Sequence, residues 1–262
     1  MRFRFGKNWK NYLKSVTENK IDVALNSLSK TIGLSDFTGK TFLDIGSGSG
    51  LMSLAALRLG AKVHSFDYDM DSVEATQFVK TTFTNEDKNW HIEQGSILDN
   101  DYLNKLGKFN IVYSWGVLHH TGNMWKAIEN SINLVEDNGM LFIALYNDQG
   151  FFSKFWKAVK YLFNLNFVTR FLIKLLFLPY FYLFQILFDT VYGFKPFKTI
   201  FNAQNRGMNF YHDVIDWIGG YPFEVASPGK IFNYFKERGF ILINMTTTTS
   251  VGCNEFIFQK IS

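Results

Sequence analysis

Three glycines at alternate positions form the part of this chain best suited to hold a small ligand. Asp44 precedes Gly46, Gly48 and Gly50, and this run lies between an apolar segment and a helical one. Glycine lets the backbone bend sharply, and it leaves room for a ligand against the main chain that a β-carbon would obstruct. The run therefore predicts a strand, a tight turn and a helix around a binding site.

The spacing of these glycines argues against a nicotinamide dinucleotide. The dinucleotide fingerprint requires a third glycine three positions after the second, and those positions hold Leu51 and Ser53. The next expected strand ends in Asp67, at about the 20-residue distance from which an acidic side chain reaches a ribose on the neighbouring strand. A solvated turn aspartate without a ligand is the alternative interpretation of Asp67.

Two adjacent histidines follow the fourth expected strand. His119 and His120 would lie beyond the carboxyl end of that strand, where open α/β sheets bind their ligands. An imidazole titrates near neutral pH and can accept a proton from a hydroxyl group. One of the two is a candidate general base, and the alternative is a histidine that only fixes its loop by hydrogen bonding.

Alternating strands and helices must position these residues. Expected strands lie at 42–45, 62–66, 90–94, 109–114 and 140–146, with helices at 51–59, 70–81 and 125–135 and a tight turn at 137–139. After a helix at 231–238, strands at 240–245 and 255–260 can pair only antiparallel, because the turn at Gly252 is short. The pattern predicts an α/β fold.

Both motifs resemble those of class I S-adenosylmethionine-dependent methyltransferases. Asp44 with its three glycines is similar to the first motif of that family. The run from Val117 to His120 is similar to the ubiquinone-pathway methyltransferases and other small-molecule O-methyltransferases. The resemblance implies a Rossmann-like, seven-stranded sheet with an antiparallel last strand. It covers nearly the whole chain except residues 151–200.

The resemblance also implies S-adenosyl-L-methionine as cofactor, with Asp67 on its ribose and Ser96 and Ile97 near its adenine. The expected cofactor-binding residues are Asp44, Gly46, Ser47, Gly48, Gly50, Asp67, Tyr68, Ser96, Ile97 and Trp115. Ser96 stands where family members often carry an acidic residue. The expected acceptor contacts are Trp9, Tyr146, Asn147, Arg206, Tyr211 and His212.

The implied reaction is methyl transfer to a small molecule. A hydroxyl acceptor is favoured because His119 or His120 could deprotonate it, and a phenol or quinone precursor or a sugar of a surface glycan would suit. The alternatives are N- or C-methylation of a metabolite, methylation of RNA or protein, and cofactor binding without catalysis. No Asn-Pro-Pro-Tyr type motif follows the fourth strand, which disfavours base methylation.

Residues 151–200 form an aromatic insertion with seventeen aromatic residues, and with seven lysines and arginines against one aspartate. Lysines at 154, 157 and 160 recur opposite Phe152, Phe155, Trp156, Val159 and Phe163, which predicts an amphipathic helix. Residues 171–188 approach the length of a membrane span, but one crossing would separate strands that must pair in one sheet. An aromatic lid, a homodimer contact and an interfacial membrane contact remain open.

Length and composition suit one domain of 262 residues. Its expected parts are an N-terminal helical cap (1–38), a cofactor-binding core (39–150), a helical insertion (151–225) and a C-terminal helix with a strand hairpin (226–262). The single Cys253 excludes an internal disulfide framework and a cysteine-rich metal site, so no metal is expected. Because no apolar leader is seen, we expect a cytoplasmic protein, and peripheral contact with the inner face of the membrane is the alternative. Because the positive charge is concentrated in the insertion, no nucleic-acid partner is expected.

Overall fold

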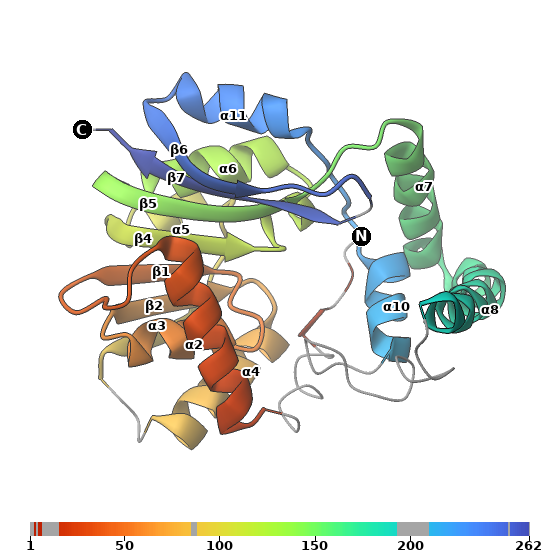
Figure 1. Cartoon of the computed structure of the whole chain (residues 1–262), viewed down its shortest axis with the longest axis horizontal. Coiled ribbons are helices and arrows are strands. Elements are labelled where there is room, and N and C mark those ends of the chain that lie inside the picture. Colours follow the sequence, from red (N-terminus) through yellow and green to blue (C-terminus); the bar gives the residue numbers. More distant parts are fainter. Residues whose placement is uncertain are drawn as a thin grey trace.

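Seven strands form one mixed sheet with helices on both faces (Figure 1). The computed structural model describes residues 3, 5, 6, 16–84, 88–192, 210–250 and 252–261. The strands are β1 (Thr41–Ile45), β2 (Lys62–Asp67), β3 (Trp90–Gln94), β4 (Phe109–Trp115), β5 (Val135–Tyr146), β6 (Phe240–Thr246) and β7 (Cys253–Lys260). Their order is β3-β2-β1-β4-β5-β7-β6, and β7 is antiparallel to both of its neighbours. The predicted Rossmann-like sheet with an antiparallel last strand is confirmed.

Two hydrophobic cores lie on opposite faces of this sheet. In β1, Phe42 contributes to one core, whereas Leu43 and Ile45 contribute to the other, because successive side chains of a strand point to opposite faces. The first core is covered by α2 (Glu18–Ile32), α3 (Leu51–Arg58) and α4 (Met70–Phe83). The second is covered by α5 (Asn100–Leu103), α6 (Met124–Asn133) and α11 (Pro228–Lys236). Burial on both faces explains why the central strands are almost continuously apolar.

The predicted turn at 137–139 proved wrong, because these residues lie inside β5. Phe109 of β4 pairs with Val135, and Ile111 pairs with Met140, so that four residues of β5 bulge between the two pairs. Asn138 has a φ of 63°, a left-handed conformation that asparagine tolerates. The turn-forming residues therefore form a β-bulge within one long strand.

The insertion lies beyond the carboxyl end of β5, at one side of the sheet (Figure 1). It contains α7 (Phe151–Leu165) and α8 (Phe167–Val191), and α10 (Phe210–Gly219) packs against both. The predicted separation of lysines from aromatic residues on α7 is wrong. Lys160 is fully buried, whereas Phe152 and Phe155 are exposed. Contacts with α10, which follows much later in the chain, decide which side of α7 is covered.

Among the described residues, α8 is the helix whose length and composition would allow it to cross a membrane, and only 6% of its most apolar window is buried. The strands that precede α8 and the strands that follow it belong to the same sheet. A single crossing would place β6 and β7 on the wrong side of the bilayer. The apolar surface of α8 therefore needs another explanation.

Candidate functional site

The glycine turn after β1 adopts the backbone conformation that its composition predicts. The φ angles of Gly46, Gly48 and Gly50 are 78°, 56° and 76°, all in the left-handed region. A β-carbon on Gly46 would lie 2.5 Å from a methyl group of Val117, and one on Gly50 would lie 3.0 Å from the Cα of Thr76. The loop that follows β4 and helix α4 thus pack directly against the turn, and side chains at these positions would push them away.

Asp67 joins this turn to the end of β2. Its Oδ2 accepts a hydrogen bond from the Gly48 amide at 3.0 Å, and its Oδ1 accepts one from the Asp69 amide at 2.8 Å. Asp67 is therefore a turn-organising residue. Since each carboxylate oxygen can accept a second hydrogen bond, this position is still compatible with a ribose contact. Ser47 adds a further tie, with its hydroxyl 2.9 Å from that of Thr76.

Asp44 lies beneath the turn and is fixed to the helix that follows. The Ser53 hydroxyl donates to Asp44 Oδ2 at 2.5 Å, and Ser53 also contacts the Ser65 hydroxyl at 2.7 Å. Burial raises the pKa of Asp44 to about 7, and the nearby charge of Asp67 adds to that rise while the Ser53 hydrogen bond opposes it. Asp44 thus orients the turn indirectly, through the first turn of α3.

A cavity opens beside the turn at the carboxyl ends of β1, β2 and β3. Its lining residues are Ile45, Gly46, Phe66, Asp67, Tyr68, Gly95, Ser96, Ile97, Leu98, Val117 and Thr121. The structure therefore brings together five of the expected cofactor contacts: Gly46, Asp67, Tyr68, Ser96 and Ile97. The Ser96 hydroxyl accepts from the Leu98 amide at 3.2 Å, which leaves its own proton available as a donor.

Trp115 was expected near the cofactor but does not line this cavity. Its indole nitrogen donates to Glu255 at 2.8 Å, which ties the end of β4 to β7 across the intervening strand β5. Asp44, Ser47, Gly48 and Gly50 also lie outside the lining and instead shape the turn. The cavity is thus formed by strand ends and backbone more than by side chains with ionisable groups.

His119 is fully buried in the short 3-10 helix η1 (Leu118–His120). Its Nδ1 accepts a hydrogen bond from the Tyr146 amide at 3.3 Å, so the proton of the neutral ring is on Nε2. Nε2 has no hydrogen-bond partner in the described part of the chain. Burial, reinforced by the charges of His120 and Lys160 and opposed by a backbone hydrogen bond with Ala144, holds the pKa of His119 well below its usual range. His119 is therefore a neutral ring with one nitrogen that lacks a well-formed hydrogen bond.

His120 has the opposite tautomer. Its Nδ1 lies 2.6 Å from the Pro222 carbonyl oxygen, and because a carbonyl only accepts, Nδ1 carries the proton. The other ring nitrogen, Nε2, is then the basic one in the neutral ring. These assignments follow from the hydrogen-bond partners. The two histidines, equivalent in the sequence, thus differ in chemistry, and His120 is better suited to accept a proton.

Aromatic side chains from distant segments enclose the histidine pair. The Tyr146 ring lies with its centroid 4.0 Å from that of His119, 5.4 Å from that of His120 and 5.1 Å from that of Phe223. Trp217 of α10 completes the group at 5.6 Å from Tyr146. We call these residues, with Lys160, the histidine pocket, a group of packed side chains that lies outside the lining of the cavity. Tyr146, an expected acceptor contact, is part of this group.

Of the other expected acceptor contacts, Asn147 and Tyr211 are described, and neither is part of the histidine pocket. The Asn147 side chain donates to the Thr248 carbonyl at 3.0 Å and accepts from Asn254 at 3.1 Å, so it holds the β6–β7 hairpin. Tyr211 is partly exposed on α10. Trp9, Arg206 and the side chain of His212 lie outside the described residues.

Lys160 was not predicted as a functional residue. Its Nζ donates to the Trp217 carbonyl and lies 4.0 Å from the centre of the Trp217 ring and 4.9 Å from that of Phe223. Burial lowers its pKa to about 7, against the opposing charge of Asp216. No signal in the helical spacing distinguished Lys160 from Lys154 and Lys157, because its partners come from α10 and the loop after it.

A family profile described as a methyltransferase domain matches residues 18–177. That match covers more than half of the chain, which therefore belongs to the methyltransferase domain family. The chain is similar to the ubiquinone biosynthesis O-methyltransferases of Pelagibacter ubique, with 30% identity over 105 residues, and of Glaesserella parasuis, with 33% identity over 124 residues. These matches cover 40% and 45% of this chain and 41% and 49% of the relatives, so the chain spans about half the length of the curated relatives it matches.

Solved structures share the fold over most of the chain. Magnesium protoporphyrin IX methyltransferase from Synechocystis with bound S-adenosylhomocysteine aligns with a TM-score of 0.53 and 13% identity, over 92% of this chain and 82% of that one. An O-methyltransferase family protein from Burkholderia thailandensis aligns with a TM-score of 0.54 and 11% identity, over 92% of this chain and 58% of that one. At these identities the likeness establishes the fold alone.

Proposed function

We propose that this protein transfers the methyl group of S-adenosylmethionine to a hydroxyl oxygen of a small acceptor. The observation that supports it most is the left-handed glycine turn, which opens onto a cavity lined by Asp67, Ser96 and Ile97. Family membership and the ubiquinone O-methyltransferase relatives agree with this chemistry. Phenols, quinone precursors and glycan sugars are the acceptors to test first.

The described residues fit such a cofactor. The backbone from Gly46 to Gly50 would hold its methionine part, Asp67 its ribose hydroxyls, and Ser96 and Ile97 its adenine. When bound, the cofactor supplies a methyl group on a positively charged sulfur. The protein's contribution is then to align the acceptor oxygen with that methyl group and to exclude water, and alignment accounts for much of the rate of such displacements.

The base in this proposal is His120. Its neutral tautomer presents Nε2 as acceptor, and the Pro222 carbonyl fixes the ring. His119, with an unsatisfied Nε2–H, would donate to an oxygen of the acceptor and orient it. A proton-accepting nitrogen beside a donor suits a hydroxyl acceptor, which must lose its proton during transfer.

Calorimetric titration of the purified protein with S-adenosylhomocysteine tests the cofactor. A screen of phenols, sugars, amines and carbon acids with labelled S-adenosylmethionine then tests the reaction. Label found on oxygen supports the proposal, and label found only on nitrogen or carbon contradicts the choice of acceptor. Binding without transfer to any acceptor would favour a non-catalytic cofactor-binding protein. Absence of cofactor binding would refute the proposal as a whole.

The apolar surface of α8 bears on where the acceptor is found. Its exposed residues include Phe167, Leu176, Leu183 and Val191, which are 80%, 67%, 59% and 79% exposed. Contiguous apolar surfaces of this kind mark contact with a membrane or another protein. We propose that this surface docks on an anionic membrane from the cytoplasmic side, so that the acceptor is carried in or on the lipid.

Charge favours lipid over a second copy of the chain. Among residues 151–192, Lys154, Lys157 and Arg170 are exposed, whereas Asp189, the sole acidic residue of that range, is fully buried. Anionic headgroups would complement these cations. A symmetric dimer through this range would bring the cations of both copies into one interface, and the range itself offers no exposed anion to pair them. The aromatic residues on α7 and α8 suit the interfacial region of a bilayer.

Vesicle flotation tests whether the apolar surface of α8 binds lipid or a second copy of the chain. Phosphatidylglycerol vesicles should bind the protein more strongly than phosphatidylcholine vesicles, and salt should weaken that binding. Leu176→Glu with Leu183→Glu should abolish it. Phe78→Glu is the matched control, because Phe78 is equally apolar and 50% exposed but lies on α4. A dimer that the α8 variants disrupt, in a protein that ignores vesicles, would contradict membrane docking.

A further inference from the structure

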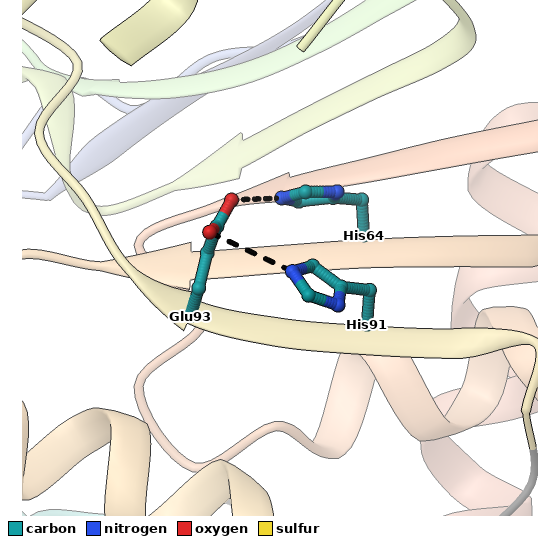
Figure 2. Close-up of side chains that lie close together, drawn as sticks. All are labelled: His64, His91 and Glu93. Carbon is teal, nitrogen blue, oxygen red and sulfur yellow. Dashed lines mark hydrogen bonds and ion pairs between the residues drawn. The ribbon is translucent and has the colours of Figure 1, made fainter. Parts of the chain in front are cut away.

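Three side chains of metal-ligand type lie together on β2 and β3, away from the histidine pocket (Figure 2). His64 of β2 pairs in register with His91 of β3, and Glu93 follows two residues later on the same strand. Alternate residues of a strand share a face, so all three project from the same side of the sheet. Their ligand atoms lie within 4.8 Å of one another.

The two imidazole rings converge on one carboxylate. His64 Nε2 lies 2.8 Å from Glu93 Oε1, and His91 Nε2 lies 3.6 Å from Glu93 Oε2. An ion between them would need only small side-chain rotations to reach all three ligands. Two imidazoles and one carboxylate form a donor set typical of Zn²⁺ sites that keep a position open to water.

The surroundings meet the other requirements of a metal site. The Tyr102 hydroxyl donates to Glu93 Oε1 at 2.8 Å, and such outer contacts orient ligands in known sites. The side chain of His91 is 63% exposed, which leaves a path for an ion from solvent.

We propose that His64, His91 and Glu93 bind one divalent transition-metal ion, Zn²⁺ in the first place. β3 is the edge strand of the sheet, and the ion would fasten it to β2 through side chains. It would also hold Glu93 and thereby Tyr102, whose ring occupies the space beside Gly95, a residue of the cofactor cavity. The ion thus stabilises the far wall of that cavity without taking part in methyl transfer.

Calorimetry with Zn²⁺ and visible absorption with Co²⁺ test this site on the full chain. We expect one equivalent of metal per chain, and Co²⁺ bands typical of low coordination number. His91→Gln and Glu93→Gln should each weaken binding by roughly 10-fold or more, as loss of a ligand does. Glu18→Gln is the control, since Glu18 is an exposed carboxylate paired with Arg58 and should leave the affinity unchanged.

Thermal unfolding provides a second readout. Zn²⁺ should raise the melting temperature of the wild type, because an ion that binds only the folded chain stabilises it. It should leave the melting temperature of His91→Gln almost unchanged. His91 is exposed, so this variant should fold, and circular dichroism without metal verifies that. Absence of binding, or equal binding by all variants, would overturn the proposal and identify the cluster as hydrogen-bonded only.

Discussion

The glycine turn and the histidine pocket both lie at the carboxyl ends of the central strands, but they are built in different ways. The turn is formed by consecutive residues, and its main partners, Asp67 and Thr76, come from the next strand and helix. The histidine pocket combines η1 and β5 with α7, α10 and the loop after α10, which lie up to about a hundred residues apart. The glycine turn is thus specified by local backbone geometry, whereas the histidine pocket depends on side chains brought together by the insertion.

The two regions also differ in how their polar groups are satisfied. In the turn, the carboxylate of Asp67 and the hydroxyl of Ser47 have hydrogen-bond partners within the chain. In the pocket, His119 Nε2 is buried without a hydrogen-bond partner among the described residues, whereas Lys160, buried against aromatic rings, donates to the Trp217 carbonyl. Unpaired buried polar groups cost stability, so they are expected where a ligand supplies the missing partner.

The largest effect should follow a change in the turn. Gly50→Ala should weaken S-adenosylhomocysteine binding by more than 10-fold and lower the free energy of unfolding by about 2 to 5 kcal/mol, through left-handed strain and overpacking against Thr76. Gly107→Ala is the matched control, because Gly107 has a φ of 77° with no atom near its absent β-carbon. It should lose only about 1 to 2 kcal/mol and keep its affinity. Equal losses would show that packing of the turn is unimportant.

A change in the pocket should affect the reaction and not cofactor binding. His120→Ala should lower turnover by roughly 10²-fold with unchanged affinity for S-adenosylhomocysteine, because the base is lost. His119→Ala should lower turnover less, because it removes a hydrogen-bond donor and leaves the base in place. A larger loss of turnover in His119→Ala than in His120→Ala would show that the two roles are assigned wrongly.

A substitution of Asp67 tests whether this residue binds the cofactor or only organises the turn. Asp67→Ala should weaken S-adenosylhomocysteine binding by about 1 to 3 kcal/mol, the usual cost of unpaired partners in a site. Asp69→Ala serves for comparison, since Asp69 caps α4 and does not line the cavity. Calorimetry measures the affinity of both variants for S-adenosylhomocysteine, and thermal unfolding measures their stability. If both lose stability equally and both keep full affinity, Asp67 is only a turn residue.

Another prediction concerns the pH dependence of stability. Lys160 has its pKa lowered from 10.5 to about 7, so between these values the unfolded chain binds more protons than the folded one. The free energy of unfolding contributed by this residue should therefore rise from pH 7 towards pH 10 and be lost as the pH falls through 7. Lys160→Met should remove that rise in urea unfolding curves. The same slope in both proteins would show that Lys160 is not buried in solution.

The sequence predicted the strands and the glycine turn because both depend on short-range patterns, whereas the arrangement of the strands in one sheet came from the family resemblance. Apolar runs between glycines mark strands buried on both faces, and the spacing of Gly46, Gly48 and Gly50 describes the turn directly. The antiparallel hairpin at Gly252 also followed from chain length alone. Each of these features is determined by residues within about ten positions of one another.

Features that depend on tertiary contacts were missed. Helical periodicity placed Lys160 with Lys154 and Lys157, but the position of α10 buries Lys160. The Asn-Gly pair in β5 looked like a turn, and only pairing with β4 shows that it is a bulge. The different tautomers of His119 and His120 depend on Tyr146 and Pro222, which cannot be identified as partners from spacing.

The contact between Gly46 and Val117 has a consequence for how the two proposed ligands affect each other. Val117 lies against the glycine turn, lines the cavity and directly precedes η1, which carries both histidines. In the proposed function, a cofactor that fills the cavity would restrict Val117 and with it η1, and would thereby favour binding of the acceptor. Thermodynamic reciprocity then requires that the acceptor raise the affinity for the cofactor by the same factor. Calorimetry should accordingly show tighter binding of S-adenosylhomocysteine when a saturating acceptor is present.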